Sequence, residues 1–145
     1  MPRPHLIILQ NETVRALLQQ SWSESEPGTA NAHEEGGFVV RTSTEDFQVI
    51  RWPKGTRNEI RVPIHSGCKI GSEEIVASFH THPNIGKDFL QEPSETDKRA
   101  VKNDPDLKGA GYVGEFVISR DTIYLVTPQG QVRELADTDE LFSDE

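Results

Sequence analysis

Apolar and polar residues follow a helical period in the first part of the chain. The short apolar run "HLIIL" (5–9) predicts a short strand or an apolar lead-in to the next element. Asn11 is a suitable N-cap for the segment after it. In residues 12–22, four apolar residues recur at helical spacing: Val14, Leu17, Leu18 and Trp22. The polar segment 23–32 then predicts a surface loop.

Strand patterns follow in the middle of the chain. Segments 36–42 and 47–52 are strand-like and are joined by the turn-prone sequence "STED". Segment 59–64 is a further candidate strand, and segment 73–81 alternates apolar and polar residues as a half-buried strand does.

One helix and a closing β-meander are expected in the second half. Ser94 is placed as an N-cap, acidic residues occupy the turn after it, and "NDP" at 103–105 ends the helix. Three strands should follow, at 114–120, 122–128 and 130–135. The whole pattern predicts a single α+β (mixed α/β) domain with a curved mixed sheet and meander, flanked by two or three helices.

Composition narrows the class of protein. The 145 residues can bury a core without disulfides. The net charge of −9 argues against a nucleic-acid binder. No apolar run approaches the roughly 18–20 residues of a membrane span, so we expect no membrane partner. The single cysteine, Cys68, favours a reducing, cytoplasmic location. We expect a domain at 1–136 and a solvated acidic tail at 137–145, for which a docking role is the alternative.

A candidate metal site lies in "FHTHPNIGKDFLQEPSETD". His80 and His82 are two residues apart, so both point to one face if a strand ends there, and Pro83 stops that strand. Asp97 adds a carboxylate if the helix that begins near Ser94 folds back over the strand end. Two imidazoles and one carboxylate suit zinc and leave one position open, which is typical of a catalytic site.

Simpler explanations exist for each part of this pattern. A His-x-His pair is weak evidence when it stands alone, and Ser94 with Asp97 can form an N-terminal capping box. The combination is much more specific, and we therefore favour a metal site.

His65 and Cys68 are interpreted as turn residues rather than a second metal pair. Trp22, Trp52, His5 and His33 are expected to be structural or incidental, although His33 is near enough in sequence to tune a general base among the glutamates that follow it.

The sequence "HTHP" followed by "SETD" resembles the signature of the JAMM (MPN-plus, JAB-domain) zinc metalloproteases. It is also similar to bacterial stand-alone members that accompany ubiquitin-like conjugation genes. The resemblance extends over about residues 5–135. It implies that His80, His82 and Asp97 bind one catalytic zinc ion. It also implies that Ser94 stabilises the oxyanion and that an upstream glutamate is the general base.

The upstream glutamate must lie in "AHEEGGFVV". Glu34 is three residues before Gly37, which is the spacing of the family, so we predict Glu34 as the general base. Glu35 is the alternative, and strand alternation allows only one of the two to face the zinc. Both could also be solvated loop residues.

The loop at 83–93 is longer than the family usually has. An insertion there need not disturb the ligands, because the cost of loop closure grows slowly with length. Phe89 and Leu90 could anchor a partner or pack the loop onto the domain.

The resemblance implies a deubiquitinase-like isopeptidase or protease that cleaves after the C-terminal tail of a ubiquitin-like protein, in conjugates or precursors. The tail would bind by strand addition, and E1- or E2-like enzymes are implied partners. One alternative keeps the site and changes the substrate, as in a toxin-associated or RadC-like peptidase. The other is a non-catalytic MPN scaffold, which the complete ligand set disfavours.

Overall fold

The computed structural model describes residues 4–42, 46–57, 59–84 and 92–142. Its centre is a seven-stranded mixed sheet in the order β2-β1-β4-β5-β6-β7, with β3 paired to β4 outside this path. Neighbouring strands are antiparallel except β4 and β5, which are parallel. The strands are β1 (Gly36–Arg41), β2 (Phe47–Arg51), β3 (Lys69–Ile70), β4 (Glu73–Thr81), β5 (Glu115–Ile118), β6 (Thr122–Val126) and β7 (Val132–Asp137).

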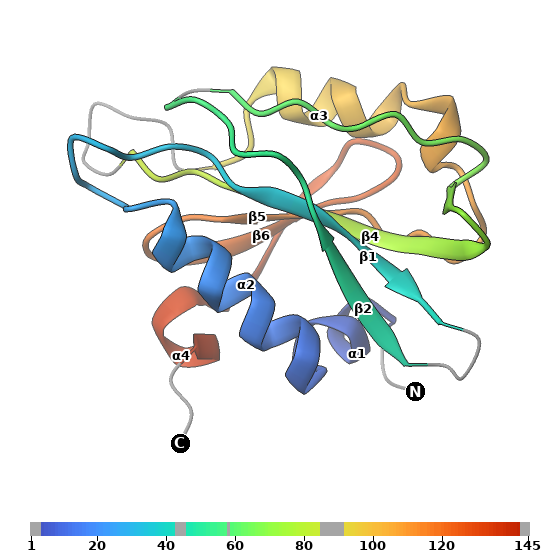
Figure 1. Ribbon diagram of the computed structural model, residues 1–145, viewed down its shortest axis with the longest axis horizontal. Helices are drawn as coiled ribbons and strands as arrows, with labels where there is room; N and C mark the ends of the chain where they lie inside the picture. The colour runs from blue at the N-terminus through green and yellow to red at the C-terminus, as the bar shows by residue number, and fades with distance from the viewer. Residues whose placement is uncertain (1–3, 43–45, 58, 85–91, 143–145) are drawn as a thin grey trace.

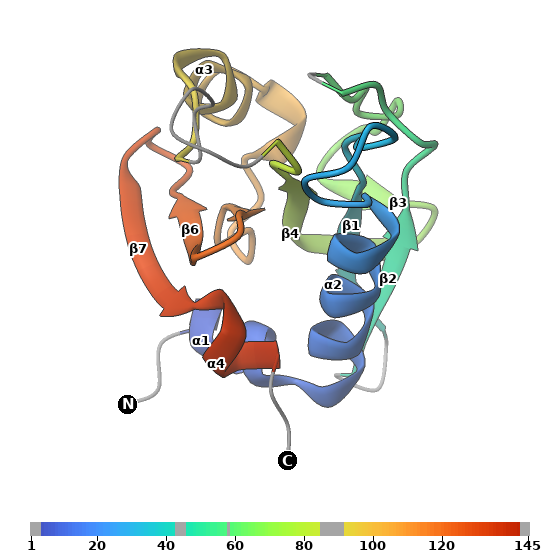
Figure 2. The ribbon, with the colours of Figure 1, turned by 90° about the vertical axis from the view of Figure 1, so that its left-hand side faces the viewer.

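Helices cover both faces of the sheet, which confirms the α+β class (Figure 1). Figure 2 shows α1 (Pro4–Gln10), α2 (Glu12–Glu24) and α4 (Thr138–Phe142) on one side, and α3 (Glu95–Lys102) on the other. The short 3-10 helix η1 (Pro105–Leu107) follows α3. None of the helices in the described ranges is long and apolar enough to cross a membrane.

Each face of the sheet has its own apolar core. Beneath α2, Leu18 packs with Phe79 and Phe116, while beneath α3 and η1 Phe38 packs with Trp52 and other buried residues. Successive side chains of a strand point to opposite faces. The even-numbered residues at the end of β4 therefore point toward the α3 layer, where the candidate site lies.

Several predicted elements are confirmed. Asn11 caps α2, and its Oδ1 accepts a hydrogen bond from the Val14 amide at 3.1 Å. β4 has the predicted bounds, and α3 begins directly after Ser94. Trp52 is buried and Trp22 packs against the core. Most of the turn predicted between β1 and β2, residues 43–45, lies outside the described residues.

The strand predicted at 5–9 is wrong, because this segment lies within helix α1. A short apolar run without alternation does not distinguish a buried strand from a helix. In α1, His5, Ile8 and Leu9 are buried at helical spacing, whereas Ile7 is 48% exposed. Pro4 occupies the first helical position, where a missing amide hydrogen costs nothing.

The strand predicted at 59–64 is also wrong. These residues belong to no strand, and the short strand β3 follows them instead. Pro63 has no amide hydrogen to donate to a ladder. Val62 is 42% exposed and Ile64 is 97% exposed. The apolar residues of this segment therefore do not form one buried face.

The solvated tail predicted at 137–145 is wrong for its described part. β7 extends to Asp137, and α4 follows directly. The Thr138 hydroxyl donates to the Ser119 carbonyl at 2.8 Å, and Phe142 packs into the core beside α2. The negative charge of the segment gives no sign of this apolar contact, to which Leu141 also contributes. Residues 143–145 lie outside the described ranges.

Candidate metal centre

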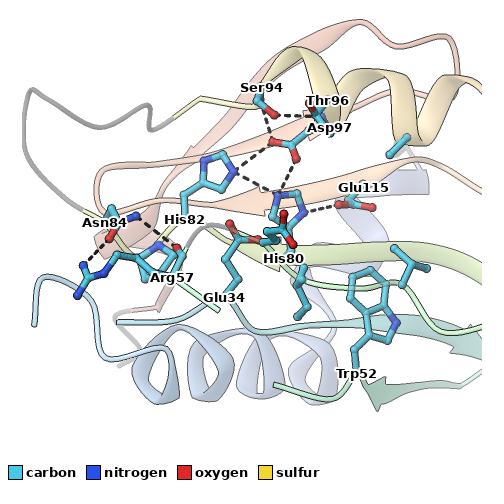
Figure 3. Close-up of a pocket in the computed structure, with 15 residues that line it drawn as sticks. Glu34, Trp52, Arg57, His80, His82, Asn84, Ser94, Thr96, Asp97 and Glu115 are labelled. Atoms are coloured by element: carbon cyan, nitrogen blue, oxygen red, sulfur yellow. Dashed lines mark hydrogen bonds and ion pairs between the residues drawn. The ribbon is translucent and has the colours of Figure 1, made fainter. Parts of the chain in front are cut away.

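The three predicted ligands converge on one point, where β4 ends and α3 begins (Figure 3). The Nε2 atoms of His80 and His82 are 3.2 Å apart. Asp97 Oδ2 lies 3.1 Å from His82 Nε2, and Asp97 Oδ1 lies 3.4 Å from His80 Nε2. All three side chains are buried or half-buried.

These separations fit a tetrahedral metal ion. Zinc binds imidazole nitrogen and carboxylate oxygen at about 2.0–2.2 Å, so two ligand atoms of a tetrahedron are about 3.3–3.6 Å apart. The observed separations of 3.1–3.4 Å are close to that value. The group could therefore hold a metal ion with only small side-chain movements.

The helix cap and the metal site use the same residues. Ser94 Oγ accepts a hydrogen bond from the Asp97 amide at 3.0 Å, and Asp97 Oδ2 accepts one from the Ser94 amide at 2.8 Å. The capping box predicted as the simpler explanation is thus present, and it directs the Asp97 carboxylate toward the histidines. Burial raises the pKa of Asp97, but hydrogen bonds from His80 and His82 outweigh burial and hold that pKa below its usual range.

The loop between the ligands is described only at its ends. Residues 85–91, which include Phe89 and Leu90, lie outside the described ranges. Whether these two residues anchor a partner or pack the loop onto the domain therefore stays open as two alternative predictions. At the near end, the Pro83 carbonyl accepts a hydrogen bond from the Gly28 amide at 3.0 Å.

Glu34 lies on the same side of the sheet as the histidines. β1 pairs with β4 so that Gly36 is opposite His80, and the Thr81 amide donates to the Glu35 carbonyl at 2.9 Å. Continuing this register places Glu34 next to His82. Side chains directly opposite each other in an antiparallel pair share a face, so Glu34 points toward the ligands.

A pocket of about 420 Å³ contains these groups. Burial raises the pKa of Glu34 to about 7; His80 opposes this rise, and the negative charges of Asp97 and Glu115 add to it. A carboxyl group with a pKa near neutral can both accept and release a proton near pH 7. The lining residues are Glu34, Trp52, Arg57, Glu59, Ile60, Val62, His80, His82, Pro83, Asn84, Ser94, Thr96, Asp97, Ala100 and Glu115.

Glu35 does not line this pocket. Its Oε1 accepts a hydrogen bond from Arg51 Nη2 at 2.6 Å, and its Oε2 lies 2.6 Å from His33 Nε2. Arg51 also donates to Glu24 on α2 at 2.9 Å. The two adjacent glutamates are therefore separated by strand alternation, and the geometry supports Glu34 as the pocket carboxyl. His33 contacts Glu35 instead of Glu34.

Among the described residues, His65 and Cys68 contact different partners. His65 Nε2 lies 2.9 Å from Asp104 Oδ2, and the buried Cys68 thiol donates to the Ile75 carbonyl. Cys68 has a positive φ of 59° and follows Gly67 with a φ of 63°. This tight turn agrees with the interpretation of the segment as a turn.

Glu115 is the site residue that sequence reasoning missed. It begins β5, lines the pocket, and its Oε2 contacts His80 Nδ1. Burial lowers the pKa of His80, but the carboxylates of Glu115 and Asp97 outweigh burial and raise that pKa well above its ordinary value. A charged residue at the start of an otherwise apolar strand was the available signal, but its partner depends on the parallel pairing of β4 with β5.

Arg57 forms part of the pocket rim. Its guanidinium donates to Asn84 Oδ1 and to the Ala30 carbonyl, both at 2.8 Å. Figure 3 shows the contact of Arg57 with Asn84, and the contact with Ala30 joins a third loop segment to these two.

Comparison of the chain with protein-family models, curated proteins and solved structures finds no match. The resemblance to the JAMM proteases therefore stays a prediction, which depends on the residues of the site.

Proposed function

We propose that this chain is a zinc-dependent hydrolase of amide bonds, of the JAMM type. The observation that carries the proposal is the arrangement in one pocket: three side chains whose facing nitrogen and oxygen atoms lie 3.1–3.4 Å apart, with one Asp97 oxygen near each histidine, beside a buried carboxyl group, Glu34, whose pKa is about 7. The three ligands leave one tetrahedral position open, as catalytic zinc sites do.

Zinc is the metal that suits this set of ligands. Two imidazoles and one carboxylate in tetrahedral spacing match known catalytic zinc sites. When bound, zinc would act as a Lewis acid that polarises the substrate carbonyl and lowers the pKa of water to about 7. His80, His82 and Asp97 would hold the ion, and the capping box keeps Asp97 in position.

Glu34 is the proposed general base. Both backbone groups of Glu34 are bound to one neighbouring segment. The Glu34 amide donates to the Thr56 carbonyl at 2.8 Å, and the Glu34 carbonyl accepts from the Gly55 amide at 2.9 Å. From this position the carboxylate accepts a proton from the attacking water. It then delivers the same proton to the leaving amine. A carboxyl group with a pKa near 7 can take part in both proton transfers at neutral pH.

Ser94 is the proposed oxyanion donor. Its Oγ already accepts a hydrogen bond from the Asp97 amide, which fixes the oxygen at the pocket wall. The hydroxyl can therefore donate its own hydrogen to the oxygen that becomes negative as the carbonyl is attacked.

The proposed substrate is the C-terminal tail of a ubiquitin-like protein, in a conjugate or a precursor. Segment 59–65 lies outside the described strands, and its residues Ile60 and Val62 line the pocket. Its backbone could pair with an extended peptide by strand addition, while the apolar side chains contact the peptide. Conjugates of this kind are the products of E1- and E2-like enzymes, which are the proposed partners.

Cleavage of tail-linked substrates tests this proposal. The protein is incubated with a panel of ubiquitin-like proteins fused through their C-terminal tails to a reporter, with and without a zinc chelator. We expect cleavage after the tail that the chelator abolishes and that Glu34→Gln loses while it still binds zinc. If the protein binds zinc but cleaves no tail fusion, the alternative of a non-catalytic scaffold would be supported instead. Cleavage restricted to unrelated peptides would support a peptidase with another substrate.

A further inference from the structure

His80 has a partner on each of its two ring nitrogens. Nε2 faces His82 and Asp97, and Nδ1 contacts Glu115 Oε2. A carboxylate only accepts hydrogen bonds, so the ring nitrogen that contacts it carries the hydrogen. Nδ1 therefore carries a hydrogen directed to Glu115, which leaves Nε2 as the ring nitrogen that can bind a metal in the pocket.

Two further residues hold the Glu115 carboxylate in place. Ser78 Oγ donates to Glu115 Oε1 at 2.8 Å, and the Tyr112 hydroxyl lies 2.7 Å from Ser78 Oγ. Because the Ser78 hydrogen is directed to Glu115, Tyr112 is the donor to Ser78. All members of the chain from Tyr112 to His80 are buried.

The pairing of β4 with β5 explains this arrangement. Ser78 is opposite Glu115 and His80 is opposite Val117 in a parallel register. Ser78 and His80 are two residues apart on β4, so both point to the same face as Glu115. The carboxylate therefore reaches both side chains from the neighbouring strand.

We propose that Glu115 is a positioning residue that holds His80 as the Nδ1–H tautomer and directs its Nε2 to the metal. The inference depends on the proposed function only for the presence of the metal. A carboxylate on the second nitrogen of a ligating histidine fixes the ring and makes it a stronger ligand, and loss of such a partner typically lowers metal affinity about 10–100-fold.

The chain provides a matched control in His65 and Asp104. This pair is also a histidine that contacts a carboxylate, at 2.9 Å, and it is also largely buried. Neither residue lines the pocket. Asp104→Asn therefore perturbs a comparable pair without touching the proposed ligands.

The experiment compares the wild type with Glu115→Ala, Glu115→Gln and Asp104→Asn. Zinc affinity is measured by competition with a chelating dye, and the visible spectrum of the cobalt-substituted protein reports ligand geometry. The ¹⁵N shifts of the His80 ring in the zinc-loaded protein report which ring nitrogen keeps its hydrogen and which one binds the metal.

Glu115→Ala should weaken zinc binding about 10–100-fold and alter the cobalt spectrum. Glu115→Gln keeps an acceptor oxygen and should retain the tautomer with a smaller loss. Asp104→Asn should bind zinc like the wild type. Wild-type affinity in Glu115→Ala, an equal loss in Asp104→Asn, or a wild-type His80 that is not Nδ1–H would overturn the inference.

Two measures keep this test independent of folding and of hydrolysis. If Glu115→Ala does not fold, Ser78→Ala releases one carboxylate oxygen instead, and it should weaken zinc binding severalfold; unchanged affinity overturns the inference. The tautomer and the metal affinity are read without any substrate. A protein that binds zinc through Glu115-oriented His80 but cleaves nothing contradicts the proposed function and leaves this inference intact.

Discussion

Replacement of Glu34 by glutamine should abolish turnover and stabilise the metal-free protein at neutral and alkaline pH. Glu34 is 9% exposed, and burial raises its pKa from the ordinary value of 4.5 to about 7. The unfolded chain therefore releases the proton more readily than the folded protein does. Folding of the ionised form carries a free-energy cost, which a neutral glutamine avoids.

The magnitude follows from the two pKa values. Below the unfolded pKa of 4.5 the carboxyl group is protonated in both states, and it does not affect stability. As the pH rises from 4.5 to about 7, stability is lost progressively. Above that range the loss levels off at about 3 kcal/mol, because each pKa unit corresponds to about 1.4 kcal/mol.

The assay is urea unfolding of the wild type and Glu34→Gln, with chelator present, at about pH 4.5 and about pH 8. Other titrating groups affect both proteins and cancel in the difference. The stability of Glu34→Gln relative to the wild type should rise by about 3 kcal/mol between the two pH values. Hydrolysis should fall by about 10²–10⁴-fold.

Two results would refute this reasoning. If the difference in unfolding free energy were the same at both pH values, Glu34 would not be a buried carboxyl with a raised pKa. If Glu35→Gln abolished hydrolysis and Glu34→Gln did not, the assignment of the base would be wrong.

Three further predictions concern the surrounding residues. Asp97→Ala should abolish tight zinc binding and also lower the unfolding free energy of the metal-free protein by about 1 kcal/mol, because it removes half of the capping box; calorimetry with and without zinc separates the two effects. Glu35→Gln should destabilise the protein by about 1–3 kcal/mol, because the ion pair with Arg51 is lost, and zinc affinity should stay unchanged in a dye-competition titration. Phe142→Ala should lower the unfolding free energy by about 3 kcal/mol in urea, whereas a solvated tail would show almost no change.

The three candidate metal ligands could be predicted to lie together because each lies in an element with a strong local signal. Alternation fixed the bounds of β4 and placed His80 and His82 on one face. The sequence "SETD" predicted the capping box, which the structure has. The choice of Glu34 over Glu35 followed from its spacing to Gly37, and the structure adds the physical reason, which is that Arg51 and His33 hold Glu35 on the other face.

The predictions that failed depended on contacts between distant parts of the chain. The run at 5–9 is equally apolar as a strand or a helix, and its packing beside α2 and the sheet determines the outcome. Segment 59–64 resembles a strand locally, but it lies outside the strands of the sheet. Glu115 could not be assigned, because its role depends on the parallel neighbour that the topology gives to β4.

The central claim is that His80, His82 and Asp97 hold one catalytic zinc ion. The most direct test is a zinc titration of the metal-free protein, followed by competition with a chelating dye. We predict one tight site per chain in the wild type and in Glu34→Gln, and loss of that site in His80→Ala, His82→Ala and Asp97→Ala. Tight binding that survives all three ligand substitutions, or no tight binding in the wild type, would contradict the claim.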